Sequence, residues 1–214
     1  APPGPAPAAG ACLLRPGGSG GVRVAAVTFG RVQDYAVRDI NNMGAAMMPA
    51  AAATLLAHFG ACGSGPEPHP RKTAGRATGA RPPPATLLAH FGACGSGPED
   101  YDAVITGDLG AVGSELLYTQ LRREGCELAH PLGCGCPLYD RDEQPVQAGG
   151  SGAGCSAAVL GAYILPQLHS GRWRRVLFVA TGALMSRATI LQGESIPGIA
   201  HAVELIAPKG EREG

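Results

Sequence analysis

The segment Arg175–Thr181, which reads RVLFVAT, limits the possible folds of this chain more than any other feature. After its first residue it is an unbroken run of apolar and β-branched side chains. A strand with one wet face alternates apolar and polar residues, whereas a continuous apolar strand is buried on both faces. The segment therefore predicts a sheet that is covered by helices on both sides.

Other segments supply the strands and helices that such a sheet needs. Strands alternating with helices are typical of α/β proteins. The order β-α-β-α-(β)-α-β-β predicts one α/β unit with a mostly parallel mixed sheet and helices on both faces. Pro49 is placed in the first turn of the first helix, where proline is accepted. Strands are predicted over 21–30, 102–107, 175–181 and 198–206, short strands over 137–139 and 145–148, and helices over 47–59, 112–124 and 155–168.

A perfect internal repeat interrupts this pattern. Residues 53–67 and 85–99 both read ATLLAHFGACGSGPE. Two copies are too few for a solenoid, and the stretch between them is basic, rich in proline and without apolar periodicity. We expect 60–98 to be a disordered insertion, which a folded unit can tolerate because loop-closure entropy grows slowly with length. The folded unit then spans 22–206, between a flexible Gly/Pro-rich lead (1–21) and a tail (207–214).

Composition and charge exclude several classes of protein. Lys and Arg total 17 and Asp and Glu total 17, so the formal net charge is zero, which argues against a nucleic-acid-binding groove. No apolar run reaches the ~18 residues of a membrane-spanning helix. The first residues, APPGPAPAAGAC, lack the charged and apolar regions of a signal peptide. Seven cysteines without such a peptide predict free thiols in a reducing compartment.

A glycine-rich loop, GGSGAGCSA at 149–157, opens the third predicted helix. It contains G-x-G-x-x-A, but a dinucleotide site also needs a preceding strand and an acid after the next strand. The next strand ends in TGAL, which has no acid. Two interpretations stay open. Free amides at a helix start bind anions or carboxylates, or the glycines only allow close packing of helix and sheet.

Two further polar residues follow or occupy predicted strands. Asp108 follows the strand 102–107, at the edge where open α/β sheets place ligands, although capping of the next helix is the favoured role. His201 lies in the last strand and either lines a pocket or faces solvent. His58 and its repeat His90 are interpreted as surface or packing residues.

The pair Cys134-Gly135-Cys136, with His130 upstream and Cys155 as a further candidate ligand, is a weak match to a metal site. Structural zinc sites usually combine two C-x₂₋₄-C pairs or their His equivalents. We therefore expect buried, inert thiols and neither a metal nor a cofactor.

Several segments taken together resemble the stage V sporulation protein AD family of endospore-forming bacteria. The resemblance covers most of 22–206, apart from the insertion, and implies a thiolase-like fold of two similar halves. This chain would supply only the C-terminal half, beginning within the last strand of the first half at Ala11–Leu14. The segments are GRV with NNMGAAMMPAAAATLLAHF, PEDYDAVITGDLGAVGSELLYTQLRREG, AGGSGAGCSA, RVLFVATGALMS and QGESIPGIAHAVEL.

The resemblance also implies a function in spores. Such a protein binds dipicolinic acid (pyridine-2,6-dicarboxylate) as part of the machinery that loads the developing spore and later serves germination. Its implied partners are membrane proteins of the same sporulation operon, and the full-length family forms a possible homodimer. The implied location is peripheral, on the cytoplasmic face of the forespore or inner spore membrane. A half alone would expose an apolar helix face, for which 155–168 is the candidate, so self-association is expected.

Catalysis is not implied, because the thiolase nucleophile loop belongs to the absent first half. The FGACGSG copies around Cys62 and Cys94 resemble that loop only superficially, GGSGAGCSA has no His, and the late loop GESIPGIA has no Cys. We expect a non-enzymatic binding protein. The alternatives are an acyltransferase half completed by another subunit and a scaffold for membrane partners. The candidate ligand-binding residues are Asp108, Gly150, Ser151, Gly152, Cys155, Ser156 and His201, with no catalytic or metal-binding residue.

Overall fold

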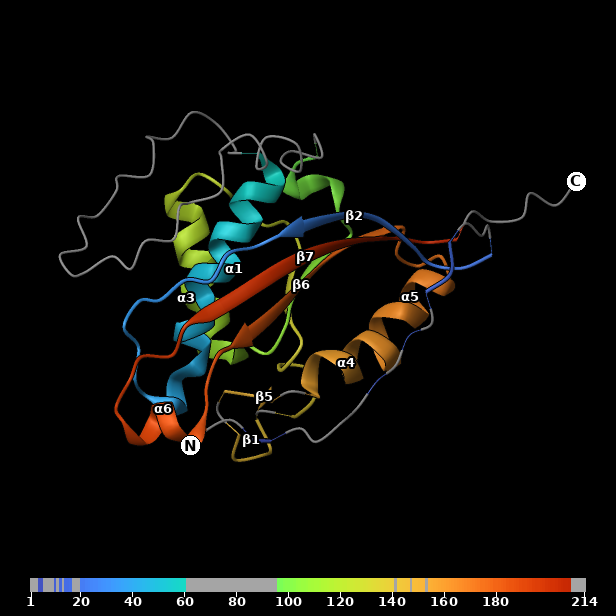
Figure 1. Ribbon diagram of the computed structural model, residues 1–214. Coiled ribbons are helices and arrows are strands. Elements are labelled where there is room, and N and C mark those ends of the chain that lie inside the picture. Colours follow the sequence, from blue (N-terminus) through green and yellow to red (C-terminus); the bar gives the residue numbers. More distant parts are fainter. Residues whose placement is uncertain are drawn as a thin grey trace, which may run out of the picture.

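A five-stranded mixed sheet organises the described residues of the computed structural model, in the strand order β2-β7-β6-β3-β4 (Figure 1). The inner strand β3 pairs in parallel with β4 and β6, while β7 pairs antiparallel with β6 and β2. The predicted α/β class with a mixed sheet is therefore confirmed. The strands are β2 (Arg23–Phe29), β3 (Ala103–Thr106), β4 (Pro131–Gly133), β6 (Arg175–Ala183) and β7 (Gly198–Ile206). The structure describes residues 4–5, 10, 12, 14–16, 20–60, 96–140, 142–146, 148–152 and 154–208.

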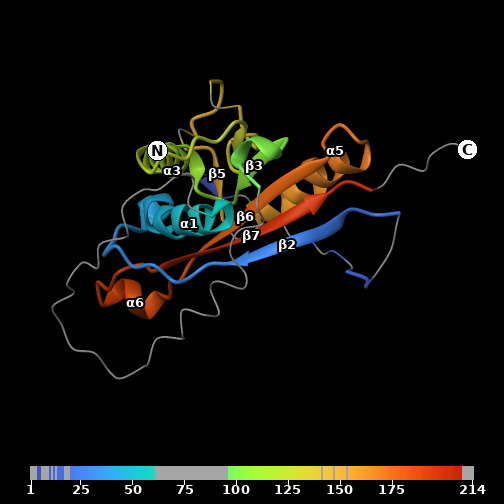
Figure 2. The ribbon, with the colours of Figure 1, turned by 90° about the horizontal axis from the view of Figure 1, so that it is seen from above.

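Helices α1 (Met43–Phe59) and α3 (Gly110–Arg123) cover one face of the sheet (Figure 2). The apolar core beneath them joins side chains of both helices to alternate residues of the two central strands β6 and β7. This is the face to which Leu177, Val179 and Ala202 point. Because successive strand residues point to opposite faces, the residues between them must be covered from the other side.

A continuous helix of fifteen residues covers that other face. It consists of α4 (Cys155–Val159), a π-helical turn (Leu160–Ile164) and α5 (Leu165–His169). The apolar core between this helix and the sheet contains Val176 and Phe178 of β6 together with Leu168 of α5. The π turn precedes Pro166, which has no amide hydrogen to give to the preceding turn, and such local changes in helix geometry commonly accompany proline. The continuous apolar segment RVLFVAT is thus buried on both faces, as the sequence predicts.

Shorter elements complete the described chain. The lead contributes β1 (Gly4–Pro5), which pairs in parallel with β5 (Gly150–Ser151). Two 3₁₀ turns, Ile40–Asn42 and Pro98–Asp100, precede α1 and β3, and α6 (Arg187–Leu191) joins β6 to β7. The repeat and its linker fall mostly on 61–95, so the prediction of a disordered insertion lies outside the described residues.

Three details of the predicted elements are wrong. The first helix begins at Met43, so Pro49 lies in its interior and not in its first turn. The helix can start earlier because Asp39 caps the 3₁₀ turn that leads directly into it. The segments 137–139 and 145–148 contain no strand among their described residues. The chain instead forms β4 earlier and β5 later, where each finds a strand to pair with, β3 for β4 and β1 for β5.

Two glycines let α1 and α3 pack with their backbones nearly in contact. A Cβ on Gly113 would lie 2.8 Å from the Cα of Gly44, and a Cβ on Gly44 would collide with the carbonyl oxygen of Leu109. Overpacking of this kind typically costs ~1–3 kcal/mol. The crossing therefore requires glycine at both positions, whereas Gly161 on the exposed side of the π turn has no atom within 4 Å of a would-be Cβ.

The two positions predict opposite effects of the same change. We expect Gly113→Ala to lower the free energy of unfolding by ~1 kcal/mol or more, because the steric cost exceeds the ~1 kcal/mol gained from helix propensity. Gly161→Ala should raise it by ~0.5–1 kcal/mol. Chemical denaturation followed by circular dichroism measures both. Equal stabilisation by the two variants would show that the helices do not cross at Gly113.

Candidate functional site

The predicted ligand-binding residues converge where the carboxyl ends of β3 and β6 meet the start of α4. Asp108 follows β3, and its carboxylate accepts hydrogen bonds from the backbone N–H of Gly152 and from Thr181 Oγ1, both at 3.2 Å. Ser156 Oγ and Thr181 Oγ1 together fill the space that a side chain on Gly107 would need. Thr181 is a member of this cluster that the sequence did not single out.

The glycines of the loop serve close packing of backbone against backbone. The N–H of Gly150 donates to the carbonyl of Gly135 at 2.7 Å, and a Cβ on Gly149 would lie 2.6 Å from that same carbonyl oxygen. A Cβ on Gly135 would collide with the carbonyl of Gly150. Close packing of the loop against the turn at Gly135 accounts for Gly149 and Gly150, and these contacts are not the packing of helix against sheet that the sequence suggested. Ser151 lies in β5, paired with Pro5.

Asp108 gives the cluster a carboxylate in place of an open anion site. Burial raises the pKa of this carboxyl, and the hydrogen bonds from its own backbone, Gly152 and Thr181 oppose that rise. The sequence suggested that Asp108 caps α3. This prediction is wrong, because the helix begins after Leu109 and its N-terminus has no side-chain cap. Its carboxylate instead takes the Gly152 N–H, one of the donors that the sequence assigned to a ligand.

His201 lies apart from this cluster. It sits on β7 opposite Ala180, its Nδ1 accepts the N–H of Gly30 at 3.1 Å, and its ring packs edge-on against Phe29. Its contacts are therefore with the end of β2. The structure brings Asp108, Gly152, Cys155 and Ser156 together but gives His201 a separate environment.

The thiols near the cluster are buried and poorly ionised. The pKa of Cys134 is raised to about 12 and that of Cys155 to about 11, mainly by burial, and the negative charge of the nearby Asp108 contributes to both shifts. A thiol is nucleophilic only as the thiolate. Neither cysteine is therefore activated for covalent chemistry. In the described part of the chain, no three Cys, His, Asp or Glu side chains are grouped as metal ligands would be.

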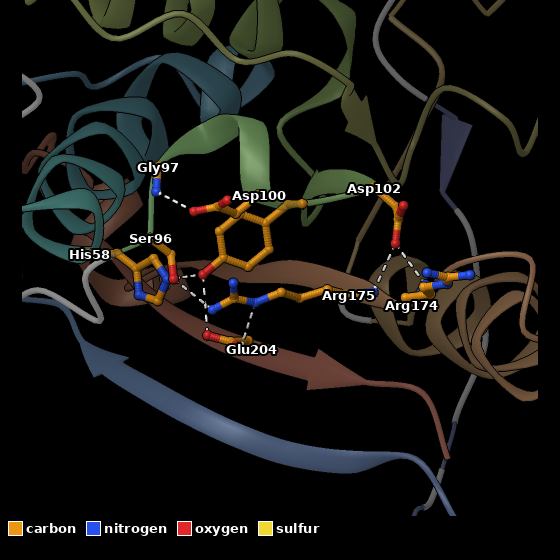
Figure 3. Close-up of polar contacts among 9 residues, drawn as sticks. His58, Ser96, Gly97, Asp100, Asp102, Arg174, Arg175 and Glu204 are labelled. Carbon is orange, nitrogen blue, oxygen red and sulfur yellow. Dashed lines mark hydrogen bonds and ion pairs between the residues drawn. The ribbon is translucent and has the colours of Figure 1, made fainter. Parts of the chain in front are cut away.

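A second polar cluster, which the sequence did not predict, lies at the opposite ends of the same strands (Figure 3). His58, at the end of α1, is fully buried. Its Nδ1 lies 2.7 Å from Thr28 Oγ1, and its Nε2 lies 2.7 Å from the hydroxyl of Tyr101. The hydroxyl of Tyr101 donates in turn to Glu204 Oε2 at 3.2 Å. Because that single proton goes to Glu204, Nε2 of His58 carries the hydrogen and Nδ1 accepts from Thr28.

The buried carboxylate of Glu204 is neutralised by Arg175. The Nε of Arg175 lies 2.8 Å from Glu204 Oε1, and the side chain of Glu204 is only 4% exposed. The guanidinium also stacks 4.7 Å from the centre of the Tyr101 ring and donates to Ser96 Oγ at 2.6 Å. We call Thr28, His58, Ser96, Tyr101, Arg175 and Glu204 the polar core. It joins the strands β2, β6 and β7 to α1 and to the segment that precedes β3.

Burial and the neighbouring charges shift the pKa values of His58 and Tyr101. Burial lowers the pKa of His58, with Glu204 opposing and Arg175 reinforcing that effect. Burial also raises the pKa of the Tyr101 hydroxyl, as does the neighbouring Glu204. From the sequence, His58 was expected to be a surface or packing residue, and the structure shows it fully buried in a hydrogen-bond network. One feature of the sequence could have indicated its buried role: His58 is a polar residue on the buried side of an Ala- and Leu-rich helix.

The thiol environment predicts slow alkylation in the folded protein. At pH 8 a thiol with a pKa of about 11 is ~0.1% thiolate, and one with a pKa of about 12 is ~0.01%. We expect iodoacetamide to modify the exposed Cys12 quickly, and Cys134 and Cys155 only after denaturation. Peptide mass spectrometry over a time course measures each site. Fast labelling of Cys155 in the native state would show that it is accessible or activated.

The neutral His58 predicts a loss of stability in mild acid. Because the folded-state pKa lies below the ordinary value of 6.5, the unfolded chain binds the proton first. The free energy of unfolding should therefore fall as the pH drops below 6.5. Denaturant titrations between pH 7.5 and 5 measure this slope. We expect His58→Gln to flatten it and the exposed control His169→Gln to leave it unchanged. The idea fails if both variants keep the wild-type slope.

No helix in the described part of the chain is long and apolar enough to cross a membrane.

A family model for stage V sporulation protein AD (SpoVAD) matches residues 5–77 and 72–206. Over 189 residues the chain is 37% identical to Stage V sporulation protein AD of Bacillus subtilis (strain 168), an alignment that covers 86% of this chain and 45% of that relative. The chain thus spans just under half the length of this relative. It belongs to the stage V sporulation protein AD family, a family of sporulation proteins.

Proposed function

We propose that this chain is a non-enzymatic ligand-binding unit and that its ligand is dipicolinic acid. The observation that carries the proposal is membership of a sporulation protein family over most of the chain. The state of the thiols supports the non-enzymatic part, because burial leaves Cys134 and Cys155 almost entirely protonated near neutral pH. The proposal extends to a peripheral location at the forespore or inner spore membrane, beside membrane proteins of the same operon.

The Asp108 cluster limits how a dicarboxylate could bind within this chain. The N–H groups of Gly150 and Gly152 already have acceptors, Gly135 and Asp108 respectively. A carboxylate that approaches this loop also meets the negative charge of Asp108, which repels it. Within this cluster, binding requires the ligand to displace Asp108 or Asp108 to be protonated. The raised pKa of Asp108 favours the second route.

Calorimetric titration with dipicolinate tests the proposal. We expect the full-length relative to bind and this chain to bind more weakly, because it spans just under half of that protein. If the ligand contacts the Asp108 cluster, Asp108→Asn should strengthen binding about tenfold, or ~1.4 kcal/mol, by removing the like charge. Glu115→Gln, which removes an exposed charge on α3, is the matched control and should change nothing.

The outcomes separate the parts of the proposal. If the full-length relative ignores dipicolinate, the proposed ligand is wrong. If it binds but Asp108→Asn has no effect in either protein, the ligand contacts other residues than this cluster. A covalent acyl adduct on Cys155 after incubation with an acyl-CoA, detected by mass spectrometry, would contradict the non-enzymatic assignment and favour the acyltransferase alternative.

A further inference from the structure

Two buried side-chain oxygens make no hydrogen bond within the described part of the chain. They are Thr106 Oγ1 and Ser114 Oγ. Thr106 is 0% exposed and Ser114 is 4% exposed, so neither hydroxyl reaches bulk solvent. The large majority of buried hydroxyls in folded proteins pair with a protein group or with ordered water, because an unpaired hydroxyl keeps the full cost of its desolvation. Both oxygens therefore require a partner.

The two hydroxyls lie on elements that face each other. Thr106 is the last residue of β3, two residues after Val104, and points to the face of the sheet that α1 and α3 cover. Ser114 lies on the buried side of α3. The turn 107–109, which carries Asp108, connects the end of β3 to α3. A group that bonds both hydroxyls would therefore hold the two ends of this turn together.

Gly133 shows that both oxygens border the same point. It is the partner of Thr106 on β4, so the two residues present the same face of the sheet. A Cβ on Gly133 would lie 2.8 Å from Ser114 Oγ, 3.6 Å from Cys136 Sγ and 3.8 Å from Thr106 Oγ1. Apart from the immediate chain neighbours of the glycine, these are the three nearest atoms, and all three are polar. In a core that is otherwise apolar, such a grouping marks a place for a polar ligand.

The chemistry of this place selects a small neutral ligand. The bordering groups are two hydroxyls and a thiol, which offer no counter-charge to an ion. The hydroxyl of Tyr118, one turn further along α3, is a third neutral group nearby: burial raises its pKa, and the Ser114 hydroxyl opposes that rise. A water molecule has two donors and two acceptors, and buried waters typically make about three hydrogen bonds to groups that would otherwise be unpaired.

We propose that one water molecule is a permanent ligand of this protein, bound between Thr106 Oγ1 and Ser114 Oγ beside the backbone of Gly133. The water joins the end of β3 to α3 and thereby fixes the turn that carries Asp108. It does so whether or not a dicarboxylate binds at the Asp108 cluster.

Removal of the two hydroxyls, singly and together, tests the proposal by chemical denaturation of the 214-residue chain. Thr106→Val and Ser114→Ala should each lower the folding equilibrium constant about fivefold, because each takes one anchor from the water and leaves the other hydroxyl without its partner. The double variant should be no less stable than the weaker single variant, because the second change removes a hydroxyl that is already unpaired.

The opposite results are equally clear. If the hydroxyls have no partner, their removal relieves a desolvation cost, and both single variants should be more stable than the wild type. If each hydroxyl has a separate partner, the two losses multiply to about 25-fold in the double variant. Either result overturns the proposal. Thr119→Val removes an exposed hydroxyl from the same helix and is the matched control, with an expected change of less than about twofold.

Amide hydrogen exchange tests the effect of the water on the turn. In Thr106→Val, exchange over 107–113 should become at least about threefold faster, while exchange over 155–168 on the other face of the sheet stays unchanged. Unchanged exchange over 107–113 would show that no water fixes this turn.

A high-resolution crystal structure of the wild-type chain provides the direct observation. We expect density for one water molecule at ~2.6–3.0 Å from both Thr106 Oγ1 and Ser114 Oγ, and no such density in Thr106→Val. A protein side chain in that place, or two hydroxyls that bond backbone carbonyls with no density between them, would contradict the assignment.

Discussion

The buried ion pair between Arg175 and Glu204 is the interaction on which the rest of the structure depends. A carboxylate that is 4% exposed cannot remain ionised in an apolar core without a partner, and removal of one partner of such a pair is typically costly. Arg175 opens β6 and Glu204 lies near the end of β7, so the pair fixes the antiparallel register of these strands. Tyr101 and His58 extend the network to β3 and α1. The positions of these elements at one end determine where Asp108, Thr181 and Gly152 meet at the other.

The internal repeat contributes to this network through both of its copies. His58 comes from the first copy and Ser96 from the second. In the first copy, the residues up to Phe59 form the end of α1, which begins in the Ala-rich segment that precedes the repeat. The turn Pro98–Asp100 forms where Asp100 follows, because Asp100 Oδ2 accepts the N–H of Gly97 at 2.9 Å.

The sequence predicted those parts of the fold that depend on local pattern. The strands β6 and β7 and the two helical layers followed from apolar runs and periodicity. The rule for strand ends singled out Asp108, but its contact with Gly152 of the glycine-rich loop was not predicted. The strand β4 was missed because three residues at a sheet edge carry no periodic signal. The polar core was missed because its members are far apart in the sequence, for example 103 residues between Tyr101 and Glu204. Only tertiary packing brings such residues together.

The two polar clusters differ in a way that bears on function. In the polar core each charge has a counter-charge, so the cluster is neutral and its role is to hold strands together. In the Asp108 cluster the donors to the carboxylate from the described part of the chain are all neutral: the backbone amides of Asp108 and Gly152 and the hydroxyl of Thr181. Burial without a cation raises the pKa of this carboxyl group, and its protonation removes the repulsion of a second anion. Where a dicarboxylate binds beside Asp108 without displacing it, binding should therefore take up a proton. The polar core does not impose this requirement, because Arg175 already balances Glu204 there.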